Sequence, residues 1–234
     1  MNSGADGRFK LVALDLDGTI LDKDLQISER VQQAVSRAAA QGVCVTIATG
    51  RMFKSSRPYA ALLGVQTPIV CYQGAMIGDP VSGEILYHQP VPLALAREVI
   101  RICQDRQLQV NVYLDDELFV ERHTPGAELY ARMSRVDLHV VGDLLAFLDR
   151  DTTKLVIVSS PEITERLTPE LSATFGSSLF ITRSYPIFTE VAHPDCSKSA
   201  ALDRLAKMLG IKPEESLAIG DNLNDVDMLR WAGV

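Results

Sequence analysis

The sequence lacks several features that would narrow its function at once. Its four cysteines form no Cys-x-x-Cys pair and its four histidines show no metal-ligand spacing, so neither residue type indicates a redox or zinc site. No stretch approaches the ~20 apolar residues of a membrane-spanning helix. The net charge is -7, and an acidic chain has no basic surplus with which to neutralise a nucleic-acid backbone. We therefore expect a cytoplasmic protein with reduced cysteines, which binds neither membrane nor nucleic acid.

What the chain does contain is typical of a globular protein. Hydrophobic residues make up 47% and charged residues 23% of its 234 residues. This length suffices for one large domain or two smaller ones, and for a core that needs no disulfide or structural metal.

The first third of the chain alternates apolar runs with amphipathic segments. Ser28 can cap a helix that ends near Gly42, and a second helix extends to about Gly64. Buried strands are predicted at 10–16, 43–49 and 68–72, where the residues are apolar or β-branched. Strand-helix-strand repetition at this spacing predicts a doubly wound, Rossmann-like parallel sheet.

The middle of the chain changes character. Apolar and polar residues alternate there over longer strands, which favours a mostly antiparallel sheet with helices on one face. The strands expected in this part are 84–91, 110–122, 154–159 and 179–191. The α/β pattern of the first third then resumes, with a helix between Ser197 and Gly210 and a strand over 216–220. We therefore predict a core domain formed by 1–80 and 191–234, interrupted by an inserted α/β domain over 81–190.

Polar clusters follow the predicted core strands, where parallel sheets bind their ligands. Asp15 and Asp17 follow the first strand, 49–51 (Thr-Gly-Arg) the second and 221–225 the last, and Lys198 begins a helix. Carboxylates gathered in this way either raise a pKa or recruit a cation, and hard oxygen ligands suit Mg²⁺. A lysine charge and a threonine hydroxyl suit phosphate oxygens, so the sequence predicts a phosphoryl-transfer site.

These clusters, in this order, resemble the four motifs of the haloacid dehalogenase superfamily. They are Asp15-Leu16-Asp17-Gly18-Thr19, Thr49-Gly50-Arg51, Lys198, and Gly220-Asp221 followed by Asn224-Asp225. The large insertion after the second motif resembles the cap domain of the Cof-type branch, whose members are phosphatases of sugar phosphates and cofactors. The resemblance covers essentially the whole chain, and four ordered motifs are far more specific than any one of them.

The resemblance implies a role for each motif residue. Asp15 would attack phosphorus and form an aspartyl-phosphate, and Asp17 would protonate the leaving alcohol and then activate water. Mg²⁺ would bind to Asp15, to the backbone carbonyl of Asp17 and to Asp221, while Asp225 would orient the metal's surroundings or Lys198. The phosphoryl group would be held by four residues, Thr49, Gly50, Lys198 and Asn224.

The acid at position 17 separates possibilities within the superfamily. A dehalogenase needs no proton donor for halide, so Asp17 favours release of an alcohol from a phosphate ester. The implied enzyme is a Mg²⁺-dependent phosphatase of a small phosphorylated metabolite, such as a sugar phosphate or phosphorylated cofactor. A phosphotransferase or mutase of the same chemistry, and an inactive regulatory relative, remain as alternatives. The motifs name neither the substrate nor the oligomeric state.

Several positions depart from the pattern or have an ordinary structural interpretation. Arg51 can be a solvated surface charge, and Asp227 a first-turn acid placed by the helix dipole. Residues 72–75 read Tyr-Gln-Gly-Ala, where the family usually has Asn-Gly-Ala. Relatives continue beyond the position of Val234 with a further strand and helix, so we expect either a shortened form or a smaller core sheet.

Overall fold

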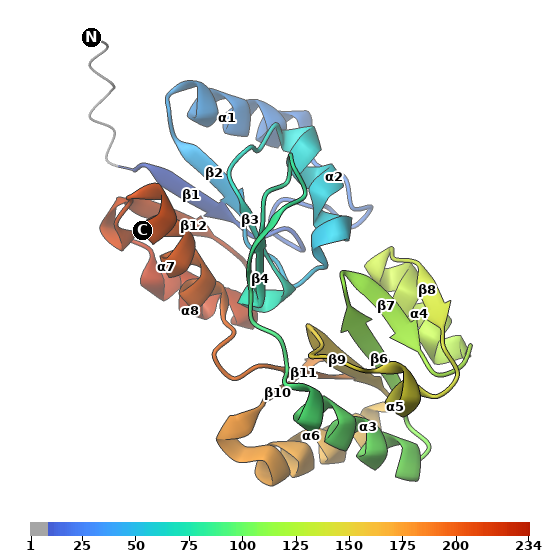
Figure 1. The fold of residues 1–234 in the computed structure, drawn as a ribbon. Helices are drawn as coiled ribbons and strands as arrows, with labels where there is room; N and C mark the ends of the chain where they lie inside the picture. The colour runs from blue at the N-terminus through green and yellow to red at the C-terminus, as the bar shows by residue number, and fades with distance from the viewer. Residues whose placement is uncertain (1–8) are drawn as a thin grey trace. The chain divides into compact units, whose positions relative to one another are not determined.

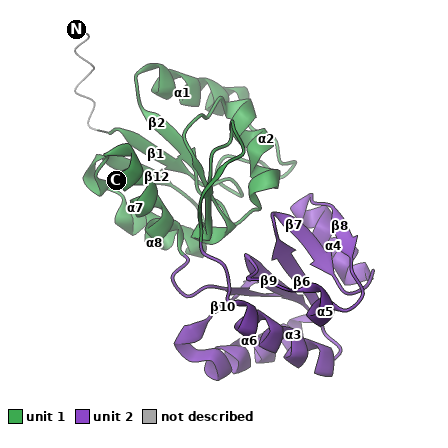
Figure 2. Ribbon diagram, viewed as in Figure 1, with its two compact units in different colours: residues 1–88, 197–234 green, residues 89–196 purple. Residues whose placement is uncertain are grey.

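The computed structural model describes residues 9–234, and its elements are drawn in Figure 1. The chain forms two compact units: unit 1 consists of Met1–His88 and Ser197–Val234, and unit 2 of Gln89–Cys196 (Figure 2). The sequence predicts an insertion over 81–190 that includes a strand over 84–91. That strand, β5 (Ile85–His88), pairs antiparallel with β4 (Met76–Gly78) and therefore belongs to unit 1.

A parallel sheet forms the centre of unit 1. Its strand order is β12-β1-β2, with the bounds Ser216–Ile219, Leu11–Leu14 and Cys44–Ile47. β1 pairs in parallel with both neighbours, and three of its four residues are buried, as expected for a strand covered on both faces. Beyond β2, Ala48 bridges in parallel to Val70 of β3 (Ile69–Cys71).

Helices cover both faces of this sheet. In Figure 1, α1 (Glu29–Ala40) and α2 (Phe53–Leu63) lie on one side, with α7 (Lys198–Leu209) and α8 (Val226–Trp231) on the other. The apolar side of α7 and α8 packs on the sheet, and this contact includes Leu202, Leu205 and Met228, all fully buried. Helices on both faces of a parallel sheet confirm the predicted doubly wound class.

The helix ends in unit 1 follow the capping signals in the sequence. The Ser28 hydroxyl accepts the backbone N–H of Val31, and the Ser197 hydroxyl accepts that of Ala200. Gly210 ends α7 in the left-handed conformation, with φ +68°. These ends confirm the expected caps, because a helix leaves its first N–H groups and last carbonyls without helical partners.

Unit 2 is built on a six-stranded sheet in the order β10-β11-β9-β6-β7-β8, antiparallel except for the last pair. The bounds in that order are Phe180–Tyr185, Phe188–Ala192, Lys154–Val158, Gln109–Leu114, Glu117–Val120 and Leu138–Val140. Three helices build the core of one face, α3 (Leu93–Asp105), α5 (Leu144–Phe147) and α6 (Pro161–Phe175). The predicted, mostly antiparallel inserted sheet is confirmed.

The opposite face of this sheet also carries a helix, whereas the sequence predicts helices on one face only. Side chains alternate between the two faces of a strand, so Tyr113 points away from the face that buries Val112. There the Tyr113 hydroxyl donates to the hydroxyl of Tyr130, which lies on α4 (Pro125–Ser134). The Tyr130 ring also packs edge-on against the Phe188 ring. Helices therefore cover parts of both faces of the sheet in unit 2.

Two segments expected as single strands are hairpins. The segment 110–122 turns back at Asp115 and Asp116, both with positive φ, and 179–191 turns between Tyr185 and Phe188. Two consecutive left-handed residues are the mark of a type I′ turn, and Asp tolerates that conformation better than most residues do. The Asp-Asp pair was the available signal for the first hairpin.

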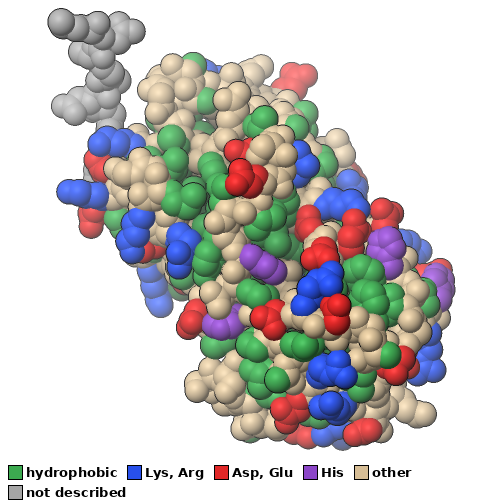
Figure 3. Space-filling model, viewed as in Figure 1, with side chains coloured by type: hydrophobic (Ala, Val, Ile, Leu, Met, Phe, Trp, Pro, Cys, Tyr) green, Lys and Arg blue, Asp and Glu red, His purple; other side chains and the backbone are tan. Residues whose placement is uncertain are grey.

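The described surface carries mixed charge. On the face drawn in Figure 3, acidic and basic side chains are interspersed over both units. None of the helices within residues 9–234 combines the length and the apolar character that crossing a bilayer demands.

Candidate active site

Side chains from three parallel strands and one helix meet at the carboxyl edge of the sheet in unit 1. Asp15 directly follows β1, Thr49 follows β2 after Ala48, and Asp221 follows β12 after Gly220. The sheet ladder continues up to the first of them, because the Asp15 N–H donates to the Ile219 carbonyl at 3.0 Å. The parallel pairing of these strands thus brings together residues that are more than 200 positions apart in the sequence. They meet at the edge where parallel sheets bind ligands.

Lys198 lies at the centre of this group. The first residue of α7, it is 1% exposed, and its Nζ is 2.6 Å from Asp15 Oδ1 and 2.6 Å from Asp225 Oδ1. The other oxygen of Asp225 accepts the backbone N–H groups of Asp221 and Asn222 at 3.1 Å each. Asp225 therefore fixes both the lysine and the loop after β12, and both of its oxygens already have protein partners.

The charge balance around Asp15 is incomplete. Burial raises the pKa of Asp15 above its ordinary value, and the nearby Lys198 ammonium offsets only part of that rise. The neighbouring acids Asp225 and Asp17 add to the increase. A further cation beside Asp15 would oppose this rise, as the Lys198 ammonium does.

The described acids include a group suited to a divalent cation. One carboxylate oxygen each from Asp15, Asp221 and Asp225 lie within 4.8 Å of one another. The Thr19 hydroxyl donates to Asp221 Oδ1 at 2.7 Å, and a Cβ at Gly18 would lie 2.4 Å from Asp221 Oδ2. Because Asp225 is already occupied, Asp15 and Asp221 are the acids that can offer oxygens, and hard oxygen donors fit Mg²⁺.

The Asp17 side chain is bound elsewhere. Arg51 donates two hydrogen bonds to the Asp17 carboxylate, from Nε to Oδ2 at 2.7 Å and from Nη2 to Oδ1 at 2.6 Å. The Arg51 side chain is only 11% exposed, so the interpretation of this residue as a solvated surface charge is wrong. Burial disfavours the charged guanidinium, yet the pairing with Asp17 outweighs this and raises the pKa of Arg51. The pair fixes the orientation of Asp17 beside the nucleophile candidate.

The loop after β3 holds the segment that carries Thr49 and Gly50. The Thr49 side chain is fully buried, and its hydroxyl accepts the Arg51 N–H at 3.2 Å. Across from it, the Gln73 N–H donates to the Thr49 carbonyl, and the Gln73 side-chain oxygen accepts the Asn224 amide at 3.3 Å. From the sequence alone, position 73 is only a departure from the family pattern. A polar residue next to Gly74 after a buried strand was the available signal.

Gly74 sets how closely this loop approaches the start of α7. It has φ +100°, and a Cβ there would lie 2.0 Å from the Ser197 carbonyl oxygen. We expect Gly74→Ala to lower the free energy of unfolding by at least about 3 kcal/mol, because both the conformation and the contact must yield. Gly42→Ala is the matched control: it has φ +84° but no atom within 4 Å, so we expect about 1–2 kcal/mol. Equal losses in urea unfolding would show that the contact with Ser197 does not matter.

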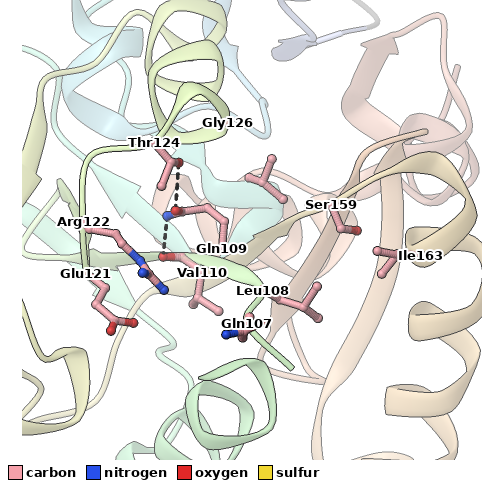
Figure 4. Close-up of a pocket in the computed structure, with 11 residues that line it drawn as sticks. Gln107, Leu108, Gln109, Val110, Glu121, Arg122, Thr124, Gly126, Ser159 and Ile163 are labelled. Carbon is pink, nitrogen blue, oxygen red and sulfur yellow. Dashed lines mark hydrogen bonds between the residues drawn. The ribbon is translucent and has the colours of Figure 1, made fainter. Parts of the chain in front are cut away.

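Unit 2 has a hollow of its own, drawn in Figure 4. Its volume is about 530 Å³ and its lining includes Gln109, Glu121, Arg122 and Thr124. The Thr124 hydroxyl donates to Gln109 Oε1 at 3.0 Å, so the polar groups there partly satisfy one another. No motif residue lines this hollow.

Comparison with known proteins decides the family. The family model described as haloacid dehalogenase-like hydrolase matches residues 12–234. The chain belongs to this family. The membership confirms the resemblance to the superfamily that the four motifs carry, and with it the expected class of enzyme, a hydrolase.

Similar proteins are named phosphatases, as the Cof-type branch implies. The HMP-PP phosphatase of Cronobacter sakazakii is 31% identical over 96% of this chain and 82% of its own length. The 5-amino-6-(5-phospho-D-ribitylamino)uracil phosphatase of Bacillus subtilis is 29% identical over 95% of this chain and 84% of its own length. By its family and its relatives, this haloacid dehalogenase-like hydrolase is an enzyme of the phosphatase type.

Solved structures agree with this assignment. TM0651 from Thermotoga maritima superposes with a TM-score of 0.88 at 29% identity, over 97% of this chain and 85% of that one. A haloacid dehalogenase-like hydrolase from Bacteroides thetaiotaomicron gives 0.89 at 26% identity, over 97% of this chain and 86% of that one. The likeness extends over both units and confirms the fold class.

Proposed function

We propose that this phosphatase hydrolyses a small phosphorylated metabolite in a Mg²⁺-dependent reaction, through an aspartyl-phosphate on Asp15. The observation that carries the proposal is the buried contact of Asp15 with Lys198, which is itself anchored by Asp225. A carboxylate at a strand end, beside one fixed cation and a second acid with a free oxygen, is suited to receive a phosphoryl group.

In the first half of the reaction, an Asp15 carboxylate oxygen forms a bond to phosphorus while the bond from phosphorus to the ester oxygen breaks. Asp17 gives its proton to the departing alcohol oxygen. In the second half, Asp17 takes a proton from water, the water oxygen bonds to phosphorus, and the bond from Asp15 to phosphorus breaks. Lys198, Thr49, Gly50 and Asn224 hold the phosphoryl oxygens in both halves.

The pairing with Arg51 bears on both roles of Asp17. The carboxylate form of Asp17, which accepts both N–H bonds of the guanidinium, is the form that takes a proton from water. When the same group carries a proton, one of its oxygens becomes a donor and no longer suits the guanidinium. The bond from Arg51 to the protonated oxygen is therefore weakened before the alcohol is released, while the other oxygen still accepts from the guanidinium.

Asp15 and Asp221 would hold the cation, with the backbone carbonyl of Asp17 as a further oxygen ligand. When bound, Mg²⁺ supplies positive charge against the phosphoryl oxygens and offsets the repulsion among the acids. The Thr19 hydroxyl bonds to Asp221, and Gly18 leaves room for the Asp221 carboxylate. Asp225 contributes indirectly, because it binds Lys198 and the backbone of the loop that carries Asp221.

We expect Asp221→Asn to raise the Mg²⁺ concentration needed for half-maximal activity by roughly 100-fold, because a charged ligand is lost. EDTA should abolish phosphate release by the native enzyme, and added Mg²⁺ should restore it. Asp227→Asn serves as the control, because Asp227 lies outside the acidic group and accepts only the Ser199 N–H. If both variants show the native Mg²⁺ requirement, Asp221 is not a ligand.

The substrate class rests on the relatives, which are named for HMP-PP and for a phosphorylated ribitylaminouracil. A sugar phosphate or a phosphorylated cofactor is the class we propose here. A panel of such esters, assayed for phosphate release in Mg²⁺, tests it. Hydrolysis confined to phosphoproteins or polynucleotides would contradict the proposal. The four free cysteines support a cytoplasmic enzyme.

A phosphotransferase or mutase would use the same residues up to the aspartyl-phosphate. It differs only in the acceptor, which would be a sugar hydroxyl in place of water. Inorganic phosphate released in stoichiometric amount with the alcohol supports the phosphatase, and a phosphorylated second product supports the transferase. A folded protein that turns over no ester of the panel would point to a regulatory relative.

A further inference from the structure

The loop after β3 has an unusual backbone. Tyr72 and Gln73 have φ +53° and +56°, a conformation that residues other than glycine rarely adopt, and Gly74 follows at φ +100°. Two consecutive side-chain-bearing residues in the left-handed region cost free energy that surrounding contacts must offset. Such conformations concentrate at functional sites, so the position of the Gln73 side chain is informative.

Backbone hydrogen bonds hold this loop against the Thr49-Gly50-Arg51 segment. The Tyr72 N–H donates to the Arg51 carbonyl at 2.9 Å, and the Gln73 N–H donates to the Thr49 carbonyl at 3.0 Å. Both bonds depend on the left-handed turn, which directs successive N–H groups toward the same neighbouring segment. These bonds therefore fix the loop against the segment proposed to hold the phosphoryl group.

The Gln73 amide spans two parts of the proposed phosphate site. Its nitrogen lies over Gly50, since a Cβ built there would be 2.6 Å from Gln73 Nε2. Its oxygen accepts the Asn224 Nδ2 at 3.3 Å, which fixes which way the amide faces. Among the described residues, no partner accepts a hydrogen bond from Gln73 Nε2. Two N–H donors thus remain beside Gly50, in a half-buried side chain.

We propose that Gln73 is a phosphate-binding residue, whose Nε2 donates to an oxygen of the transferring phosphoryl group beside Gly50 and Asn224. The inference rests on the proposed function and extends it by one substrate contact. In a site that already holds several carboxylates, a neutral donor adds affinity for the anion without adding another charge to be buried.

Three variants test this contact. Gln73→Gly removes the donors and also removes the conformational cost, so the midpoint of thermal unfolding should stay the same or rise. The KM for a phosphate ester and the Ki of inorganic phosphate should each rise about 10-fold. Gln73→Glu has the same size but presents a carboxylate oxygen, so kcat/KM should fall by more than about 100-fold. Gln73→Asn keeps the amide with a shorter reach, so its KM and its Ki for inorganic phosphate should lie between those of the native enzyme and Gln73→Gly.

A second background separates direct contact from an effect through Asn224. If Gln73 binds phosphate itself, Gln73→Gly should still raise the Ki of inorganic phosphate in an Asn224→Ala enzyme. No further rise there, or a native Ki in Gln73→Gly and Gln73→Glu, would overturn the proposal. Failure of the proposed function looks different: the native enzyme itself would neither release phosphate from the ester panel nor bind inorganic phosphate.

Discussion

Replacing Asp15 by Asn should abolish phosphate release, with a fall in kcat of roughly 10⁴-fold or more. The amide has the size of the carboxylate but cannot form an acyl-phosphate bond to phosphorus. It also withdraws one of the two acids that can offer an oxygen to the cation. The measurement is phosphate release from the best ester of the panel at saturating Mg²⁺. Native turnover by Asp15→Asn would refute the nucleophile assignment.

The same variant should keep its fold, and this separates chemistry from stability. Burial raises the folded-state pKa of Asp15 above its ordinary value of 3.8. A raised folded pKa gives a contribution to stability that is complete below about pH 3.8 and is lost as the pH rises through the folded value. Ionised Asp15 therefore destabilises the metal-free protein at neutral pH. The uncharged side chain of Asp15→Asn does not cause this loss of stability.

The stability comparison is made in EDTA, where no cation compensates the acids. The unfolding midpoint of Asp15→Asn should equal or exceed that of the native protein at pH 7, and the advantage should shrink toward pH 4. A functional residue that costs stability is a common compromise at active sites. A large loss of stability in the variant at pH 7 would mean that the pairing of Asp15 with Lys198 outweighs burial.

Local signals in the sequence were enough for much of the fold. The caps at Ser28 and Ser197 and the αL end at Gly210 depend on neighbouring residues only, so they were predictable. The place of β5 was not, because an alternating strand pairs equally well with either sheet on local criteria. Only its antiparallel contact with β4 assigns it to unit 1.

The candidate site was predictable to the extent that strand ends define it. Parallel strands bring their carboxyl ends to one edge, so Asp15, Thr49 and Asp221 could be expected together. The partner of a side chain is set by tertiary geometry, which the motif spacing does not contain. For that reason Arg51 was open to interpretation as a surface charge, and Gln73 was seen only as a departure from the family pattern.

Replacing Lys198 by Met should have the largest effect on stability. The ammonium is almost completely buried and is 2.6 Å from carboxylate oxygens of both Asp15 and Asp225. Methionine has a similar length but no charge, so two buried acids lose their shared counter-ion. Removing one member of a buried ionic group costs about 3–5 kcal/mol, a large part of the 5–15 kcal/mol that typically stabilises a folded protein.

The pH dependence identifies the cause of that loss. Without the lysine, the folded-state pKa of Asp15 rises further above its unfolded value, so its contribution to stability is present at low pH and lost as the pH rises. The deficit of Lys198→Met against the native protein in EDTA should therefore be greatest at neutral pH and shrink toward pH 4. Added Mg²⁺ should recover part of it, because a cation bound by Asp15 and Asp221 lies next to the same charges.

Lys207→Met supplies the matched control. Lys207 lies on the same helix and pairs with Asp203 at 2.6 Å, but its side chain is 76% exposed. Water screens such a pair, so this variant should lose no more than about 0.5 kcal/mol and show the native pH dependence. If the two lysine variants were equally stable at pH 7, the buried lysine would not be compensating Asp15 and Asp225. The electrostatic account of the site would then have to rest on the cation alone.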